Sequence, residues 1–293
     1  GGSKTGVLNS GVLTNTPTYN YRTALVSSAS LTSDDNLHFD ASSLRTFGSR
    51  YEDAYTNLNN PYPTPESGAT GHFIFGNSNQ LFLDLTSNNS TLQIQNSGGS
   101  AYSYDLGDTT VAGPTAGNVT RGLLSNIDDT SNFTMCMVFK YEGASVGTIL
   151  NGNLGVSGST TAGHSWFVSP ANDLRFNERG GVGAQTLRTS AQLTVGKYYF
   201  IASSLDSSDN YVLMIADSSD ADGSHELTGT GSGRSTSTRK ISAGNVHYES
   251  STFSGNAVVS EMIFFDTAKT LTELRAIANR SRTRLAARGI TVE

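Results

Sequence analysis

Tyrosine and asparagine side chains gather in the stretch between residues 50 and 71. It carries Tyr51, Tyr55, Tyr62 and Asn59, and three prolines interrupt it. Aromatic faces can stack on sugar rings, and amide groups can hydrogen-bond sugar hydroxyls. The same composition suits a protein interface, where tyrosine supplies rigid, amphipathic contact area. A loop that only covers the edge of its own domain is the third interpretation. These four residues are our first candidates for ligand or partner binding.

The acidic residues form no catalytic pattern. A retaining glycosidase needs two carboxyl groups about 5 Å apart. Glu261 and Asp266 are five positions apart, so they face opposite sides of a regular strand and do not form such a pair. We predict no catalytic residue and expect the chain not to be an enzyme.

Metal ligation has weak support in the sequence. The five histidines stand singly, without the close spacing of zinc ligands. Calcium needs several converging oxygen ligands, which these aspartates would offer: Asp128, Asp129, Asp217, Asp220 and Asp222. Turn-forming and capping roles explain the same residues. We predict no metal ligand and no cofactor, with calcium as the alternative.

The overall charge argues against two classes of partner. A formal net charge of -6 at pH 7 does not favour broad binding to nucleic acid or to an anionic membrane. The chain also contains no apolar run of about 18 residues, and we expect no signal peptide, because no apolar stretch follows Gly1 to Lys4. We expect neither nucleic acid nor membrane as a partner.

Arginine is locally enriched near the C-terminal end of the sequence. The five arginines are Arg275, Arg280, Arg282, Arg284 and Arg288. They either form a solvated helix face or contact an acidic neighbouring subunit. We predict Arg280 and Arg284 as partner-binding residues.

We expect the candidate binding residues to be positioned by short strands that polar turns connect. Charged residues make up only 15% of the chain, which contains 31 glycines, and this composition favours strands and tight turns. Apolar strand patterns occur at 71–75, 81–85, 91–95, 133–141, 165–168, 173–176, 197–202, 211–216 and 257–266. Asn151-Gly152 predicts a type I′ hairpin turn. The segment 217–240 shows few strand signals.

Two segments stand out within this pattern. Residues 133–141 are apolar on both faces, which predicts a central strand and a buried, unreactive thiol at Cys136. The last strand pattern leads into a helix over about 270–288. Thr270 and Glu273 match a capping box, and Gly289 stands where a left-handed C-cap would end the helix.

The fold class that follows is all-β. We predict a two-sheet antiparallel jelly-roll sandwich, because many short strands with apolar faces must stack in two layers. Residues 1–30 are polar and weakly patterned and are expected to form an extended N-terminal arm. Residues 31–293 are expected to form the sandwich domain, which ends in the helix.

Four segments, in the same order, resemble the concanavalin A-like and laminin-G-like jelly-roll family. They are Leu37–Ser42, Leu81–Leu92, Phe133–Lys140 and Val259–Asp266. Phe82 stands where the family usually has tryptophan, and the Glu-x-Asp-x-x-Glu pattern of the family's glucanases is absent. The resemblance covers residues 36–293. The polar arm and the Ser/Thr/Asn-rich composition are most similar to virion proteins of tailed bacteriophages.

The resemblance implies a non-enzymatic virion structural protein, a head decoration or tail appendage subunit. Its partners would be other virion subunits and further copies of itself, and its place would be the virion, assembled in the host cytoplasm. The alternative is a lectin-like, carbohydrate-binding or receptor-binding module that contacts cell-surface glycan. A glycan hydrolase is the third hypothesis. Fold alone does not decide among them.

Overall fold

The structure is a computed structural model. The chain divides into two compact units, residues 1–63 and residues 64–293. The predicted division into an arm and a sandwich near residue 30 stays a prediction. The structure describes residues 32, 40–48, 65–75, 84–96, 102–104, 109–111, 121–143, 146–155, 162–179, 181–216, 225–248 and 251–293.

In the first unit, residues 41–48 form a helix. The Asp40 carboxylate caps its first turn, because it accepts hydrogen bonds from the Ser42 hydroxyl and from the Ser43 amide, both at 2.7 Å. The segment Leu37–Ser42, which carries the resemblance, therefore ends in a helix, and residues 37–39 lie outside the described residues.

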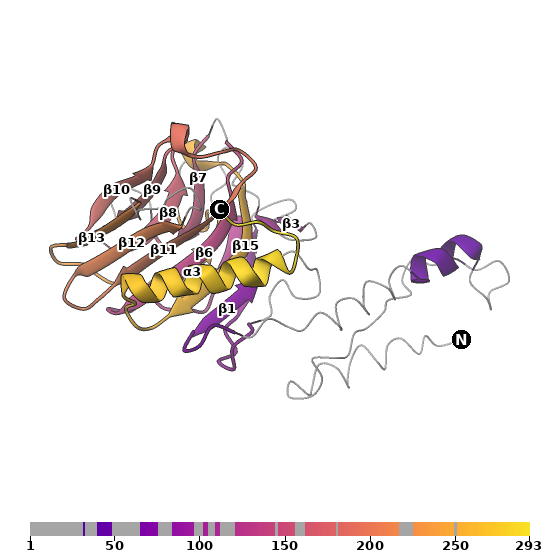
Figure 1. The fold of residues 1–293 in the computed structure, drawn as a ribbon, viewed down its shortest axis with the longest axis horizontal. Helices are drawn as coiled ribbons and strands as arrows, with labels where there is room; N and C mark the ends of the chain where they lie inside the picture. The colour runs from indigo at the N-terminus through magenta and orange to yellow at the C-terminus, as the bar shows by residue number, and fades with distance from the viewer. Residues whose placement is uncertain are drawn as a thin grey trace. The chain divides into compact units, whose positions relative to one another are not determined.

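The second unit is an antiparallel sandwich of two sheets, which confirms the predicted fold class (Figure 1). The first sheet contains β13 (Glu226–Thr230), β12 (Asn210–Ala216), β11 (Tyr198–Leu205), β6 (Phe133–Lys140), β15 (Ala257–Phe265), β4 (Thr109–Val111) and β3 (Tyr102–Tyr104), in this order, with β1 (Gly71–Ile74) also paired to β15. The second sheet contains β10 (Gly183–Arg188), β9 (Leu174–Glu178), β8 (His164–Val168), β7 (Thr148–Gly152), β14 (Ser242–Ala243), β5 (Arg121–Ser125) and β2 (Leu92–Asn96).

Alternate residues of the central strands enter two different apolar layers. In β6, Met135 and Met137 lie in the core between the sheets, whereas Cys136 and Val138 lie in a second cluster with the helix α3 (Leu271–Ala286). Side chains alternate between the faces of a strand, so β6 must be apolar on both. Burial raises the pKa of the Cys136 thiol well above its ordinary value, as expected for an unreactive thiol.

The helix α3 covers the outer face of the first sheet (Figure 1). The Thr270 side chain accepts from the Glu273 amide, and the Glu273 carboxylate accepts from the Thr270 amide, which confirms the predicted capping box. At the other end, Gly289 has φ +80° and the Ile290 amide bonds the Leu285 carbonyl, a Schellman motif. No helix among the described residues is long and apolar enough to cross a bilayer.

A bulge in β15 determines which side chains of this strand face α3. Val259 faces the core between the sheets, but the register shifts between Val259 and Glu261. After the shift, Met262 faces the core, and Glu261 and Ile263 share the face that α3 covers. The bulge thus places one carboxylate beneath the helix.

Three local predictions were wrong or incomplete. Asn151 and Gly152 lie within β7, not in a turn. Gly152 is needed because a Cβ there would collide with the His164 carbonyl of the neighbouring β8. The polar segment 217–240 contains β13, whose sequence lacks apolar alternation, and of the predicted strand 81–85 only Asp84 and Leu85 are described and neither is in a strand.

Candidate functional site

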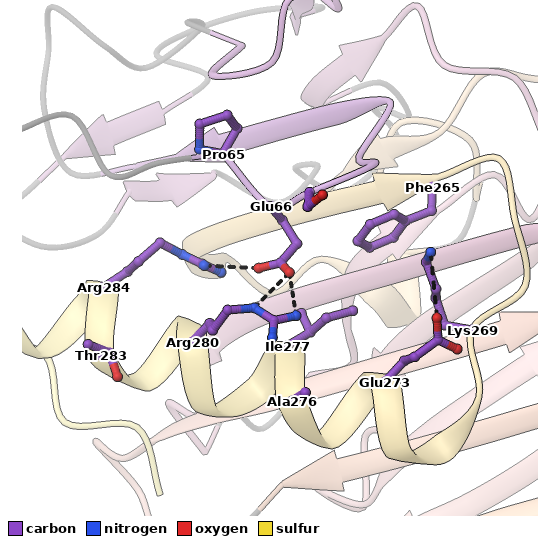
Figure 2. Close-up of a pocket in the computed structure, with 11 residues that line it drawn as sticks. Pro65, Glu66, Phe265, Lys269, Glu273, Ala276, Ile277, Arg280, Thr283 and Arg284 are labelled. Carbon is purple, nitrogen blue, oxygen red and sulfur yellow. Dashed lines mark hydrogen bonds and ion pairs between the residues drawn. The ribbon is translucent and has the colours of Figure 1, made fainter.

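A groove of about 680 Å³ runs between residues 65–67, near the start of the second unit, and α3 (Figure 2). Pro65, Glu66 and Ser67 form one wall, and Phe265 and Ile277 contribute apolar surface to it. The other wall consists of α3 residues, among them the predicted partner-binding residues Arg280 and Arg284. The helix rises about one turn between these two arginines, so both side chains point to the same side.

Glu66 is held by both arginines. Its Oε1 accepts from the Nε of Arg280 at 2.8 Å and also from Nη2, and its Oε2 accepts from the Nη1 of Arg284 at 3.0 Å. The Glu66 side chain is only 4% exposed. Two guanidinium partners compensate this buried carboxylate, whereas removing one partner would leave part of its charge uncompensated.

Arg284 extends this network to β15 and β1. Its Nε donates to Glu261 Oε1 at 2.7 Å, and the same oxygen lies 2.9 Å from His72 Nε2. The Nδ1 of His72 accepts from the Glu66 amide at 3.0 Å, so the proton of the neutral ring sits on Nε2 and faces Glu261.

The pKa shifts of Glu261 and Arg284 both favour the charged form of the side chain. Burial raises the pKa of Glu261, but the hydrogen bond from His72 and the charge of Arg284 outweigh it, and the pKa falls to about 2. Burial also opposes the charge of Arg284, but Glu261 and Glu66 raise its pKa above the ordinary value.

At its other end the groove carries Lys269 and Glu273. The ammonium of Lys269 lies 3.9 Å from Glu273 Oε1 and 4.7 Å from the centre of the Phe265 ring. Each cation of the groove therefore has an acidic partner. The arrangement offers hydrogen-bond donors and acceptors side by side over an apolar floor, without a marked excess of either charge.

A second polar cluster fixes the loop that follows β13. Asp129 is buried and binds the guanidinium of Arg234, the Ser237 amide at 2.9 Å and the Asn153 side chain at 3.3 Å. The buried ring of His164 lies 3.8 Å from Asp129. Burial lowers the pKa of His164 to about 4, although the charge of Asp129 acts in the opposite direction.

The partners of Asp128 and Asp129 test the predicted alternative that these aspartates bind calcium. Asp129 is occupied by protein donors, and Asp128 instead pairs with Lys240. Within the described ranges, no three His, Cys, Asp or Glu side chains gather as a metal site. The other three aspartates of that hypothesis, at 217, 220 and 222, lie outside the described residues.

The predicted site residues fall into two groups. Arg280 and Arg284 lie together in the groove, where both bind Glu66, and their role toward a partner stays a prediction. Tyr51, Tyr55, Tyr62 and Asn59 lie outside the described residues.

Sequence reasoning missed Glu66, Glu261 and His72. Glu66 and Arg280 are 214 positions apart, and no local pattern joins them. The one available signal was a charged residue at position 261 in the middle of an otherwise uncharged, mostly apolar strand, which requires a buried partner.

Neither a family model nor a curated protein matches the chain. Among solved structures it is similar to a Trypanosoma rangeli sialidase in complex with 2,3-difluorosialic acid, with 12% identity, a TM-score of 0.54 and coverage of 75% of this chain and 34% of that one. It is also similar to the botulinum neurotoxin serotype G binding domain, with 10% identity, a TM-score of 0.50 and coverage of 73% and 51%. The chain thus spans about a third to a half of these neighbours.

At this level of identity the likeness shows the fold alone, a β-sandwich that occurs in an enzyme and in a binding domain. The expectation that the chain is not an enzyme is corrected by this finding. It rested on the absence of a paired-carboxylate pattern in the sequence, yet a chain named as a sialidase contains the same fold.

Proposed function

We propose that the chain is a lectin-like, carbohydrate-binding module and that the groove along α3 binds an uncharged, hydroxyl-rich segment of a glycan. The observation that carries the proposal is the charge balance of the groove. Lys269, Arg280 and Arg284 are matched by Glu273, Glu66 and Glu261.

A sugar hydroxyl donates one hydrogen bond and accepts others, so it needs donors and acceptors within reach of each other. The exposed nitrogens of Arg280 and the carboxylate of Glu273 provide both kinds of group. The carbon-bound faces of a sugar ring would lie on the apolar surface of Ala276 and Ile277. A strongly anionic ligand fits less well, because Glu66 already neutralises the guanidinium of Arg280.

The comparisons support this proposal at the level of the scaffold. One neighbour is a sialidase in complex with sialic acid, and another is a toxin binding domain. Those names describe those proteins: the sialidase supports a carbohydrate ligand for this fold, and the toxin domain supports a binding role.

The test compares two arginines of the same helix. Arg280 is 52% exposed and binds Glu66 in the groove, whereas Arg275 is 53% exposed and binds Glu226 on another face. On a glycan array followed by calorimetry with the best ligand, Arg280→Gln should weaken binding roughly tenfold, as the loss of a charged hydrogen bond predicts. Arg275→Gln loses the same charge and should bind like the parent chain.

A second variant fills the groove without touching an ion pair. Ala276→Phe places a ring in the groove and should abolish binding while the melting temperature changes little. The proposal is wrong if no glycan is retained on the array, or if Arg275→Gln and Arg280→Gln weaken binding equally.

Assembly into a bacteriophage virion is the second candidate. The resemblance to virion jelly rolls supports it, because virion subunits act through contacts with neighbouring subunits or with further copies of the chain. The neighbours named above are not phage proteins. Sedimentation of the full chain would test it, since this candidate requires a defined oligomer and a lone binding module does not.

A further inference from the structure

A second, smaller cavity of about 190 Å³ lies at one end of the sandwich. Strand ends from both sheets meet there: β1 and β6 begin beside the end of β15, and β2 begins beside the end of β5. The apolar side chains of Ile127, Phe133 and Phe265 contribute to its lining. Phe265 also contributes to the α3 groove, but the polar groups of the two sites are different.

Each hydroxyl group that lines the cavity already donates its hydrogen bond to a backbone carbonyl. Thr70 donates to the Phe264 carbonyl at 3.1 Å, Ser90 donates to the Thr70 carbonyl at 2.7 Å, and Thr130 donates to the Asn132 carbonyl at 2.6 Å. A hydroxyl has one proton and two lone pairs, so these three groups can offer only lone pairs to a ligand.

The two carboxylates of the cavity are acceptors as well. Asp128 is 68% exposed and shares its Oδ1 with Lys240, which leaves Oδ2 available. Asp266 is exposed and has no hydrogen bond or ion pair with any residue in the described ranges. Of the lining residues that the structure describes, Asn126 supplies the one side-chain donor, its amide nitrogen, while its oxygen accepts from the Thr91 amide at 2.9 Å. The cavity therefore combines a rim of acceptors, one unpaired negative charge and an apolar floor.

We propose that this cavity binds the side chain of a lysine presented by a protein partner. The ammonium group has three donors and no acceptor, which matches the rim, and it would pair with Asp266. The four-carbon stem would lie on Ile127 and the two phenylalanines.

Two other ligands match these groups less well. A sugar needs donors as well as acceptors, and the side chains of the cavity supply one donor. A calcium ion needs six to eight oxygens and gains nothing from an apolar floor. Among the described residues only two carboxylates line the cavity, and one of them is shared with Lys240.

The experiment follows the δ1 methyl signal of Ile127 in the full chain by ¹³C NMR, assigned with Ile127→Val. Nα-acetyl-lysine methylamide should shift this signal in a saturable way. Nα-acetyl-norleucine methylamide has the same stem without the charge and should not. Asp266→Asn should weaken the response to lysine roughly tenfold, because a charge-assisted hydrogen bond is lost. Glu142→Gln removes an exposed carboxylate just beyond the opposite end of β6 and should leave the response unchanged.

Each other outcome overturns the proposal. An equal shift with norleucine would identify a merely apolar pocket. An unchanged response in Asp266→Asn would remove the ion pair on which the proposal depends. A saturable shift with calcium chloride but none with lysine would identify a metal site. Because the α3 groove is untouched by these variants, glycan binding can succeed or fail independently.

Discussion

At the scale of single residues, His164 is a buried side chain whose charge state affects stability. Its ring is buried, tilted against Phe133 at 5.1 Å and stacked on Phe176 at 6.1 Å between ring centres. Neither ring nitrogen has a hydrogen-bond partner among the described residues. Such an environment stabilises the neutral form, and this explains why the pKa of His164 falls from 6.5 to about 4.

A lowered histidine pKa predicts how stability depends on pH. Between pH 6.5 and pH 4 the unfolded chain binds a proton at His164 that the folded chain does not, so stability falls as the pH falls through this window. From pH 7.5 to pH 5 this single group should remove about 2 kcal/mol from the free energy of unfolding. His164→Phe keeps an aromatic ring and should lack this part of the pH dependence. Urea unfolding at both pH values measures it, and identical pH profiles for the two proteins would contradict the assignment.

At the scale of elements, α3 is the part whose stability depends most clearly on its own sequence. Thr270→Ala removes the side-chain cap of the helix and should lower the free energy of unfolding by about 1 kcal/mol. Thr270→Ser keeps the hydroxyl and serves as the control. Urea unfolding of the three proteins measures the difference, and equal stability of the alanine variant and the parent chain would show that packing alone holds the helix.

The same helix shows what could be predicted from the sequence. Its limits are encoded locally, in Thr270, Glu273 and Gly289, so they were predicted closely. The two-faced character of β6 was also visible, because alternation is a local property. The strand β13 could not be predicted, because its residues have no apolar alternation and it is held by pairing with β12.

The candidate site was predicted only in part, for a related reason. Arg280 and Arg284 stood out as a local cluster of charge. Their partners Glu66 and Glu261 come from distant positions, and Glu261 faces α3 only because of the bulge after Val259. Neither long-range pairing nor a one-residue register shift leaves a recognisable sequence pattern.

At the scale of the whole molecule, the second unit contains three layers and two cores. The larger core fills the space between the sheets, and the smaller one lies between the first sheet and α3. Every described residue of both clusters lies within residues 69–292. We therefore expect the sandwich to fold without the first unit.

A deletion and a truncation of very different length test this architecture. Deletion of residues 1–63 removes none of the described residues of either core and should change the free energy of unfolding by less than about 1 kcal/mol. Truncation after Arg288 removes only five residues but takes away the buried side chains of Ile290 and Val292 and the bond from the Glu293 amide to the Tyr198 carbonyl. It should lower stability by roughly 3 kcal/mol or more, since each buried aliphatic side chain contributes about 1.5 to 3 kcal/mol. Thermal and urea unfolding of the two proteins provide the comparison. A larger loss from the long deletion than from the short truncation would mean that residues 1–63 form part of the cooperative core.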